Sequence, residues 1–348
     1  PLRSDRERTP ARPASGGGVC KRYILQAMRP LSRLLPFLLA RAAVTQECFR
    51  SANLDPPFPF CKGQARVCPQ SPDAPRCVAG MAPSDSQRYV FYTFPPNEDI
   101  HVSAWLHKTG GFYDVHQHFI LDYALKEHNP KHMVGNRSLR PIVLDVGSNL
   151  GTLTLYAAAT RCCSVHAFEL QYEVATLLSM SVGELDVSQR SRTFVHHTAV
   201  SDGATRNVSY DSQPSNPGGV GLRTPTTSDQ RTVQTVALDT IFHQSLTPRG
   251  RSILMLKIDT EGHELSVLLS ARKLLQARAI RHMMIEVRAA YALDILNLVY
   301  GFGYVCTWAQ PSPILALASP FLPSTFHHEI ATISAFRDLH CFHGRKWP

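Results

Sequence analysis

From residue 142 onward, short apolar runs alternate along the chain with longer segments of helical length. The apolar runs predict strands at 142–146, 164–168, 193–198, 253–258 and 282–287, and the longer segments predict helices near 151–160, 172–186 and 262–278. Strands that alternate with helices form parallel sheets. The pattern therefore predicts an α/β fold with a mostly parallel central sheet and helices on both faces.

Further elements flank this alternation on both sides. The other predicted elements are a β-prone segment at 89–94, a helix at 112–128, an extra strand at 232–238, a helix at 289–300, and closing strands at 304–308 and 329–336. Residues 207–230 are rich in Pro, Gly, Ser and Thr and predict a long loop. That loop is either a substrate lid or a tolerated surface insertion.

A glycine-bearing turn follows the first predicted strand. The strand Ile142–Val146 leads into Gly147 and Gly151, and an alanine-rich helix starts directly afterwards. Glycine lets the backbone approach a ligand closely, and the free N–H groups of the first helical turn face that ligand. The turn is therefore typical of a nucleotide-like cofactor site, although the same pattern also closes strand–helix turns that bind nothing.

Polar residues around this turn indicate which cofactor it suits. Dinucleotide sites favour G-x-G-x-x-G, whereas this chain has Asp145-x-Gly147-x-Asn149-x-Gly151. The carboxylate of Asp145 would repel a pyrophosphate but suits a cationic amino group, such as that of S-adenosylmethionine. Glu169 ends the next strand and is placed to accept hydrogen bonds from two ribose hydroxyls, a role that acids also have in NAD sites. We therefore expect S-adenosylmethionine rather than a dinucleotide.

A second group of acids follows the fourth predicted strand. Asp259, Glu261 and Glu264 lie at and just beyond its end. Ligands of such sheets bind beyond the carboxyl ends of the strands, so Asp259 and Glu261 should face the same crevice as Asp145 and Glu169. Clustered carboxylates raise one another's pKa, which suits a general base, and they could also hold a divalent cation. The alternative is that these acids only stabilise the helix macrodipole.

Six motifs with these features occur in order along the chain: Val143–Gly151, Ala167–Glu169, Ala199–Asp202, Ala237–Asp239, Leu256–Glu264 and Ile285–Val287. Together they resemble the FkbM-type S-adenosylmethionine-dependent methyltransferases, and the resemblance covers residues 110–310. It implies the Rossmann-like methyltransferase fold and, for most members, O-methylation of a hydroxyl-bearing substrate.

The resemblance also implies roles for single residues. Asp145, Gly147, Asn149 and Gly151 would line the methionine end of the cofactor, and Glu169 would hold the ribose. Asp259, Glu261 and Glu264 would face the reacting centre. Two departures from the family pattern bear on cofactor affinity. Leu170 stands where the family usually has proline, and Ser179-Met180-Ser181 stands where it usually has asparagine.

For the reaction, we expect a substrate oxygen to attack the cofactor methyl while a carboxylate or His263 takes the hydroxyl proton. The acceptor is then a small molecule or a glycan, and the sequence does not indicate an oligomeric state. One alternative is a catalytically inactive Rossmann-like binding module of the secretory pathway. Another is an NAD-dependent oxidoreductase, against which Asp145 and Asn149 argue.

Residues 1–47 differ in character from the rest of the chain. Residues 1–22 are polar and of low complexity. From Met28, a short basic stretch, an apolar run at 34–40 and the small-residue site Ala40-Arg41-Ala42 predict a secretory signal peptide. The apolar run is too short for a stable membrane span. An organelle transit peptide and an amphipathic surface helix are the alternatives, so we expect the secretory pathway or, failing that, an organelle.

Residues 48–88 read as a Pro/Cys-rich linker before the catalytic domain, which we place at 89–348. Cys48, Cys61, Cys68 and Cys77 suit two disulfides in an oxidising compartment. The triplets that begin at Asn136 and Asn207 are N-glycosylation sequons, which support that compartment only weakly.

Two further groups invite a metal interpretation that we do not adopt. Asp114, His116 and His118 do not share one helical face, so solvated or capping side chains are the better prediction. Cys162 and Cys163 follow a predicted core helix and are expected to be buried thiols. The sequence therefore assigns no metal site.

The net charge is concentrated at the N-terminus. Ten of the 36 basic residues and three of the 27 acidic residues fall within residues 1–50, which carry +7 of the formal charge of +9. The remainder of the chain is nearly neutral. This distribution argues against a nucleic-acid partner for the catalytic domain.

Overall fold

The computed structural model describes residues 76–81, 88–109, 114–127, 140–203, 205–210, 216–222, 231–243, 246, 252–309 and 320–343. All of them belong to the unit Pro57–Pro348. Several predictions lie outside the described residues: the leader at 1–47, the cysteines Cys48, Cys61 and Cys68, and the sequon at Asn136.

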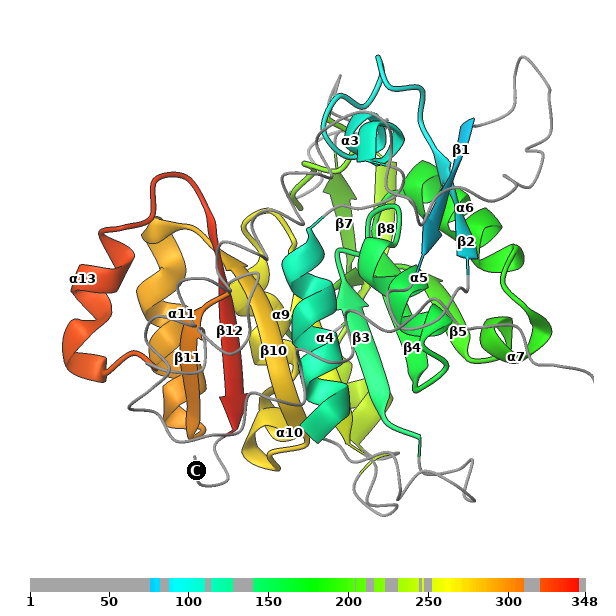
Figure 1. The fold of residues 1–348 in the computed structure, drawn as a ribbon. Helices are drawn as coiled ribbons and strands as arrows, with labels where there is room; N and C mark the ends of the chain where they lie inside the picture. The colour runs from blue at the N-terminus through cyan, green and yellow to red at the C-terminus, as the bar shows by residue number, and fades with distance from the viewer. Residues whose placement is uncertain are drawn as a thin grey trace, which may run out of the picture. The chain divides into compact units, whose positions relative to one another are not determined.

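A seven-stranded sheet forms the centre of this unit (Figure 1). Its strands, in spatial order, are β11 (Tyr304–Trp308), β12 (Arg337–His343), β10 (Ile280–Val287), β9 (Ile253–Ile258), β3 (Ile142–Val146), β4 (Ser164–Glu169) and β5 (Thr193–His197). From β10 to β5 every neighbouring pair is parallel, whereas β12 runs antiparallel to both β10 and β11. The predicted α/β fold with a mostly parallel sheet is confirmed.

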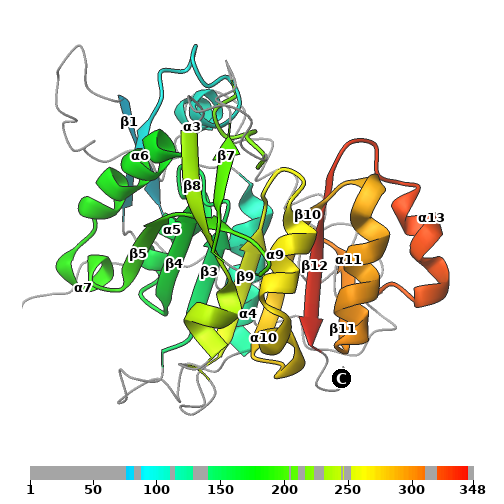
Figure 2. The ribbon, with the colours of Figure 1, turned by 180° about the vertical axis from the view of Figure 1, so that it is seen from behind.

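Helices cover both faces of this sheet. One face carries α4 (Val115–Glu127), α5 (Thr152–Ala159) and α6 (Tyr172–Gly183); the other, seen in Figure 2, carries α9 (Glu264–Ser270), α10 (Arg272–Gln276) and α11 (Ala289–Gly301). Alternate residues of a strand point to opposite faces. Accordingly, Val143 joins the core beneath α5, whereas Leu144 joins the core beneath α9.

Two smaller sheets and several short helices complete the described part. The small sheets are β1 (Arg76–Met81) with β2 (Arg88–Thr93), and β6 (Ala199–Val200) with β8 (Arg231–Val236) and β7 (Asn207–Tyr210). The short helices are α3 (Val102–Thr109), α7 (Val187–Arg190), the π-helix η5 (Asp239–His243), the 3-10 helix η7 (Pro323–Thr325) and α13 (Phe326–Ile330). None of the described helices has the length and apolar character needed to cross a membrane.

Two predicted elements were wrong. The segment 207–230 begins not as a loop but as β7, which pairs antiparallel with β8 and keeps Val208 and Tyr210 buried. The strand predicted at 329–336 is also absent. The chain there ends α13 at Ile330, and the closing strand is β12, in which Leu339 and Cys341 enter the core.

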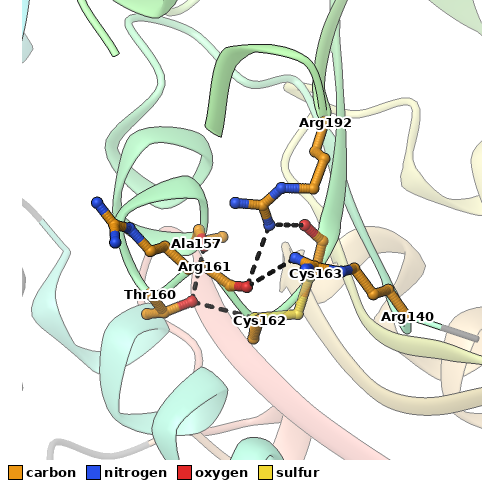
Figure 3. Close-up of a disulfide and its surroundings, with 7 residues drawn as sticks. All are labelled: Arg140, Ala157, Thr160, Arg161, Cys162, Cys163 and Arg192. Carbon is orange, nitrogen blue, oxygen red and sulfur yellow. Dashed lines mark hydrogen bonds between the residues drawn. A yellow bond between two sulfur atoms is a disulfide. The ribbon is translucent and has the colours of Figure 1, made fainter. Parts of the chain in front are cut away.

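The expected free thiols at Cys162 and Cys163 form a disulfide with each other (Figure 3). The pair lies in the turn between α5 and β4, where Arg192 donates hydrogen bonds to the carbonyls of Arg161 and Cys163, and Arg140 also donates to that of Arg161. The sequence shows that the two cysteines are adjacent, but it does not show the turn that brings their sulfurs together, so the disulfide was not predicted. A second disulfide, Cys306–Cys341, joins directly opposite residues of β11 and β12.

Candidate functional site

A cavity of about 350 Å³ opens beyond the carboxyl ends of β3, β4, β9 and β10. In open α/β sheets, this edge is where ligands bind. Its lining includes Val146, Gly147 and Asn149 at the end of β3, residues 168–171 at the end of β4, and residues 259–261 after β9. Glu286 and Arg288 line it at the end of β10. The volume lies within the usual range for small-molecule pockets.

The turn after β3 is pressed against the end of β9. Gly147 has φ of 72°, and a Cβ added there would lie 1.7 Å from the carbonyl oxygen of Asp259. Only glycine fits this contact. Asn149 also has positive φ, at 49°, which asparagine tolerates better than most residues. Gly147 and Asn149 both line the cavity, whereas Gly151 packs against Leu178.

Glu169 is held in place by two backbone donors. Its Oε2 accepts a hydrogen bond of 2.9 Å from the amide of Asn149, and its Oε1 accepts one of 2.9 Å from the amide of Gln171. Burial raises the pKa of Glu169 to about 7, against the opposite effect of the bonds from Gln171 and Asn149. The carboxyl therefore faces the cavity in a fixed orientation.

Asp145 forms a buried polar group with Lys257 and does not line the cavity. Its Oδ2 accepts a bond of 2.6 Å from Thr154 Oγ1, and its Oδ1 lies 3.6 Å from Lys257 Nζ. Lys257 Nζ also donates to the Gly147 carbonyl at 2.7 Å and lies 3.2 Å from Asp259 Oδ2. Lys257 thus ties the glycine turn to Asp145 on the neighbouring strand β3 and to Asp259 just beyond its own strand.

Burial by itself would lower the pKa of Lys257, but the attraction of Asp259 and Asp145 raises it above its usual range, so the side chain stays charged. Sequence reasoning missed Lys257. A signal was present, because a lysine in a buried strand requires anionic partners.

Three carboxylates gather on one wall of the cavity. Asp259, Glu261 and Glu286 each offer one oxygen, and the three oxygens lie within 4.8 Å of one another. Burial, followed by the charges of Asp259 and Glu261, raises the pKa of Glu286 to about 9. Arg288 donates a hydrogen bond to Glu261 Oε2. Glu286 had no role in the sequence analysis, although it lies one residue before the end of β10 and Glu169 lies at the end of β4.

Glu264 and His263 lie next to this wall but do not line the cavity. Glu264 is fully buried, and its Oε1 accepts bonds from the Thr260 amide (2.9 Å), the Thr260 hydroxyl (3.1 Å) and the Gly262 amide (3.0 Å). It therefore fixes the turn in which Glu261 has φ of 54°. His263 Nε2 lies 3.0 Å from Ser201 Oγ.

The start of α4 faces the site rather than solvent. His118 is buried and stacks on Tyr156, with ring centroids 3.9 Å apart, so the prediction of a solvated or capping side chain was wrong there. Asp114 lines the cavity and accepts a bond from Gln117. His116 Nε2 lies 2.7 Å from Asp338 Oδ2, and Asp338 also lines the cavity.

Comparison with known proteins gives a family match. Residues 145–306 match the methyltransferase FkbM domain. No curated protein matches the chain. The matched range contains the glycine turn, Glu169, Lys257 and all three carboxylates of the cavity wall.

Solved structures of low similarity also match. The methyltransferase domain of bacterial CtHen1-C has 10% identity, with 66% of this chain and 100% of that chain covered, at a TM-score of 0.32. The glycopeptide N-methyltransferase MtfA complexed with S-adenosylmethionine has 8% identity, with 64% and 94% covered, at 0.30. A SAM-dependent methyltransferase from Agrobacterium tumefaciens has 11% identity, with 74% and 68% covered, at 0.32. At these scores, none of them carries an argument about the chemistry of this chain.

Proposed function

We propose that this chain, which belongs to the FkbM family of S-adenosylmethionine-dependent methyltransferases over residues 145–306, methylates a hydroxyl oxygen in the cavity at the strand ends. One observation carries the proposal. The glycine turn and Glu169 open onto the same cavity as the acids Asp259 and Glu261. A cofactor subsite and a group able to accept a proton thus share one space.

The residues present fit S-adenosylmethionine. Glu169 has both oxygens oriented by backbone amides, and each oxygen keeps a lone pair for a ribose hydroxyl. Asp145 does not line the cavity and its Oδ1 lies 3.6 Å from Lys257 Nζ, so we assign it to holding the glycine turn rather than to contacting the cofactor. The close contact at Gly147 keeps this part of the wall free of side chains. Val200, Val220 and Leu222 line the cavity as well and offer an apolar surface for a base.

When bound, the cofactor supplies a methyl group on a cationic sulfur. The chain must then orient the acceptor and receive its proton. Asp259 and Glu261 line the cavity and are the proposed proton acceptors at their carboxylate oxygens. We assign Glu264 and His263 to positioning: Glu264 holds the turn that carries Glu261, and His263 contacts Ser201.

The test is transfer of a labelled methyl group. Purified chain is incubated with cell extract and S-adenosylmethionine that carries an isotope-labelled methyl, and products are identified by mass spectrometry. Label on an oxygen of a small molecule or glycan supports the proposal. Label on nitrogen or carbon alone contradicts O-methylation. Cofactor binding without any labelled product would instead support an inactive binding module.

We further propose that the protein works in the secretory pathway. The disulfides Cys162–Cys163 and Cys306–Cys341 support this, because disulfides persist in oxidising compartments. Residues 1–47 fused to a fluorescent protein should direct it to the endoplasmic reticulum. Delivery to mitochondria would favour the transit-peptide alternative.

A further inference from the structure

We propose that Asp259, Glu261 and Glu286 form a binding site for a hard divalent cation, of the class of Mg²⁺, Mn²⁺ or Ca²⁺, at the acceptor end of the cavity. This inference rests on the proposed function for its purpose, which is to hold and acidify the acceptor hydroxyl. Cation binding itself can be measured without cofactor or acceptor. The two proposals can therefore fail separately.

The geometry of the three carboxylates is the first argument. One oxygen from each lies within 4.8 Å of the others, so a single ion can contact all three. The residues come from separate backbone positions: Asp259 directly after β9, Glu261 in the following turn, and Glu286 within β10. The turn is itself fixed by Glu264, so the ligand set does not depend on a free loop.

Glu286 supplies an independent argument. Its side chain lines the cavity although the residue is only 9% exposed. Its Oε2 is buried and has no hydrogen-bond partner among the residues that the structure describes. A buried carboxylate oxygen without a partner is costly, and such a group needs an explanation. A cation in the cavity provides one.

The charge balance around the cavity points the same way. Six described acids line it: Asp114, Glu169, Asp259, Glu261, Glu286 and Asp338. Arg288, which contacts Glu261, is the lining residue with a permanent positive charge in the described part of the chain. Lys257 contacts Asp259 but is shared with Asp145. Arg288 contacts Oε2 of Glu261, and Lys257 contacts Oδ2 of Asp259. The other oxygen of each carboxylate remains for a cation.

The donor chemistry selects the class of ion. The set contains carboxylate oxygens alone, without histidine or cysteine, and such sets suit Mg²⁺, Mn²⁺ and Ca²⁺ rather than Zn²⁺. A bound cation lowers the pKa of a hydroxyl that coordinates it. With a cation bound, Asp259 and Glu261 would serve as its ligands instead of taking the proton directly, and the hydroxyl proton would leave to solvent.

The test is a Mn²⁺ titration of the full chain, followed by electron paramagnetic resonance of the free ion. We expect one site that Mg²⁺ or Ca²⁺ competes for. Glu286→Gln keeps the shape of the side chain but cannot supply an anionic ligand. Residues that only support a metal ligand already cost at least about tenfold in metal affinity when they are replaced. Loss of a direct ligand in Glu286→Gln should therefore weaken Mn²⁺ binding by more than about tenfold. Because glutamine has the shape of a protonated glutamate, this variant should fold about as well as the parent.

Asp114→Asn is the matched control, since Asp114 also lines the cavity but lies outside the cluster, and asparagine tolerates its φ of 46°. It should leave Mn²⁺ affinity nearly unchanged. Absence of Mn²⁺ binding at millimolar ion, or equal losses in the two variants, would overturn the proposal. Binding of S-adenosylmethionine is also measured after treatment with a chelator. If the cofactor still binds while Mn²⁺ does not, the cation site is contradicted and the proposed function is not.

Discussion

Gly147 carries the most restrictive steric requirement of any single residue at the site. We expect Gly147→Ala to lower the free energy of unfolding by more than the roughly 1–2 kcal/mol that a left-handed backbone costs an alanine, because the new methyl would also collide with the Asp259 carbonyl. Chemical denaturation measures the loss. Gly203 is the matched control, with φ of 77° and open space around it. Equal costs at the two positions would show that the turn does not touch β9 as described.

Glu169 makes cofactor affinity depend on pH. Its pKa is raised to about 7, so the free carboxyl gains a proton as pH falls below that value and loses part of its capacity to accept bonds from ribose hydroxyls. We expect affinity for S-adenosylmethionine to weaken as pH falls from 8 to 6. In Glu169→Gln, affinity should be lower throughout and should lack this dependence. Calorimetric titrations at several pH values give the comparison, and an identical pH profile in the variant would exclude Glu169 from the ribose site.

Most single elements could be predicted from hydrophobic pattern. The strands at 142–146 and 253–258 were correct to the residue, because a parallel strand buried on both faces is a nearly continuous apolar run with clear ends, which Asp145 and Lys257 each interrupt at only one position. Antiparallel β12 was missed, since its sequence alternates apolar residues with Asp338 and His340, whose partners come from distant segments. Local sequence does not contain those partners.

The residues of the site also divide into those that local sequence predicts and those that depend on distant segments. Acids at strand ends can be read from sequence because parallel strands finish at one edge. Lys257 and Glu286 could not be assigned in this way. Lys257 contacts Asp145 and the Gly147 carbonyl in the β3 segment and Asp259 just beyond its own strand. Glu286 matters only because β9 and β10 are neighbours in the sheet.

The pairing of β11 with β12 predicts an unequal contribution of the two disulfides. Replacing Cys306 and Cys341 together with alanine should lower stability by about 2–4 kcal/mol, because the bond closes a loop with a sequence separation of 35. The same double replacement at Cys162 and Cys163 should cost much less, since adjacent residues close almost no loop. Denaturation of both variants under non-reducing conditions tests this. A larger loss at Cys162 and Cys163 would contradict the expectation.

Buried histidines should make the stability of the whole molecule sensitive to acid. Burial lowers the pKa of His118 to about 4, whereas in the unfolded chain it titrates near 6.5. The contribution of neutral His118 to stability is therefore complete above pH 6.5 and is lost as pH falls toward 4. At pH 5 the loss of unfolding free energy is about 2 kcal/mol. Burial lowers the pKa of His340 to about 3 with the same sign.

The raised pKa of Glu169 and Glu286 acts in the opposite direction, so the measurement must compare variants. His118→Phe retains a ring against Tyr156 and should reduce the loss of unfolding free energy between pH 7 and pH 5 by about 2 kcal/mol. Replacement of the exposed His327 by Gln should leave that loss unchanged. A wild-type pH profile in His118→Phe would show that His118 is not buried in its neutral form.

The central claim is that the cavity at the strand ends holds S-adenosylmethionine. Calorimetric titration of the full chain with this cofactor at pH 8, in parallel with Glu169→Gln, tests it most directly. The account predicts saturable binding at one site per chain, strongly weakened in the variant, with no comparable heat from NAD. Absence of heat and of any thermal shift at millimolar cofactor, or equal affinity in both proteins, would contradict it.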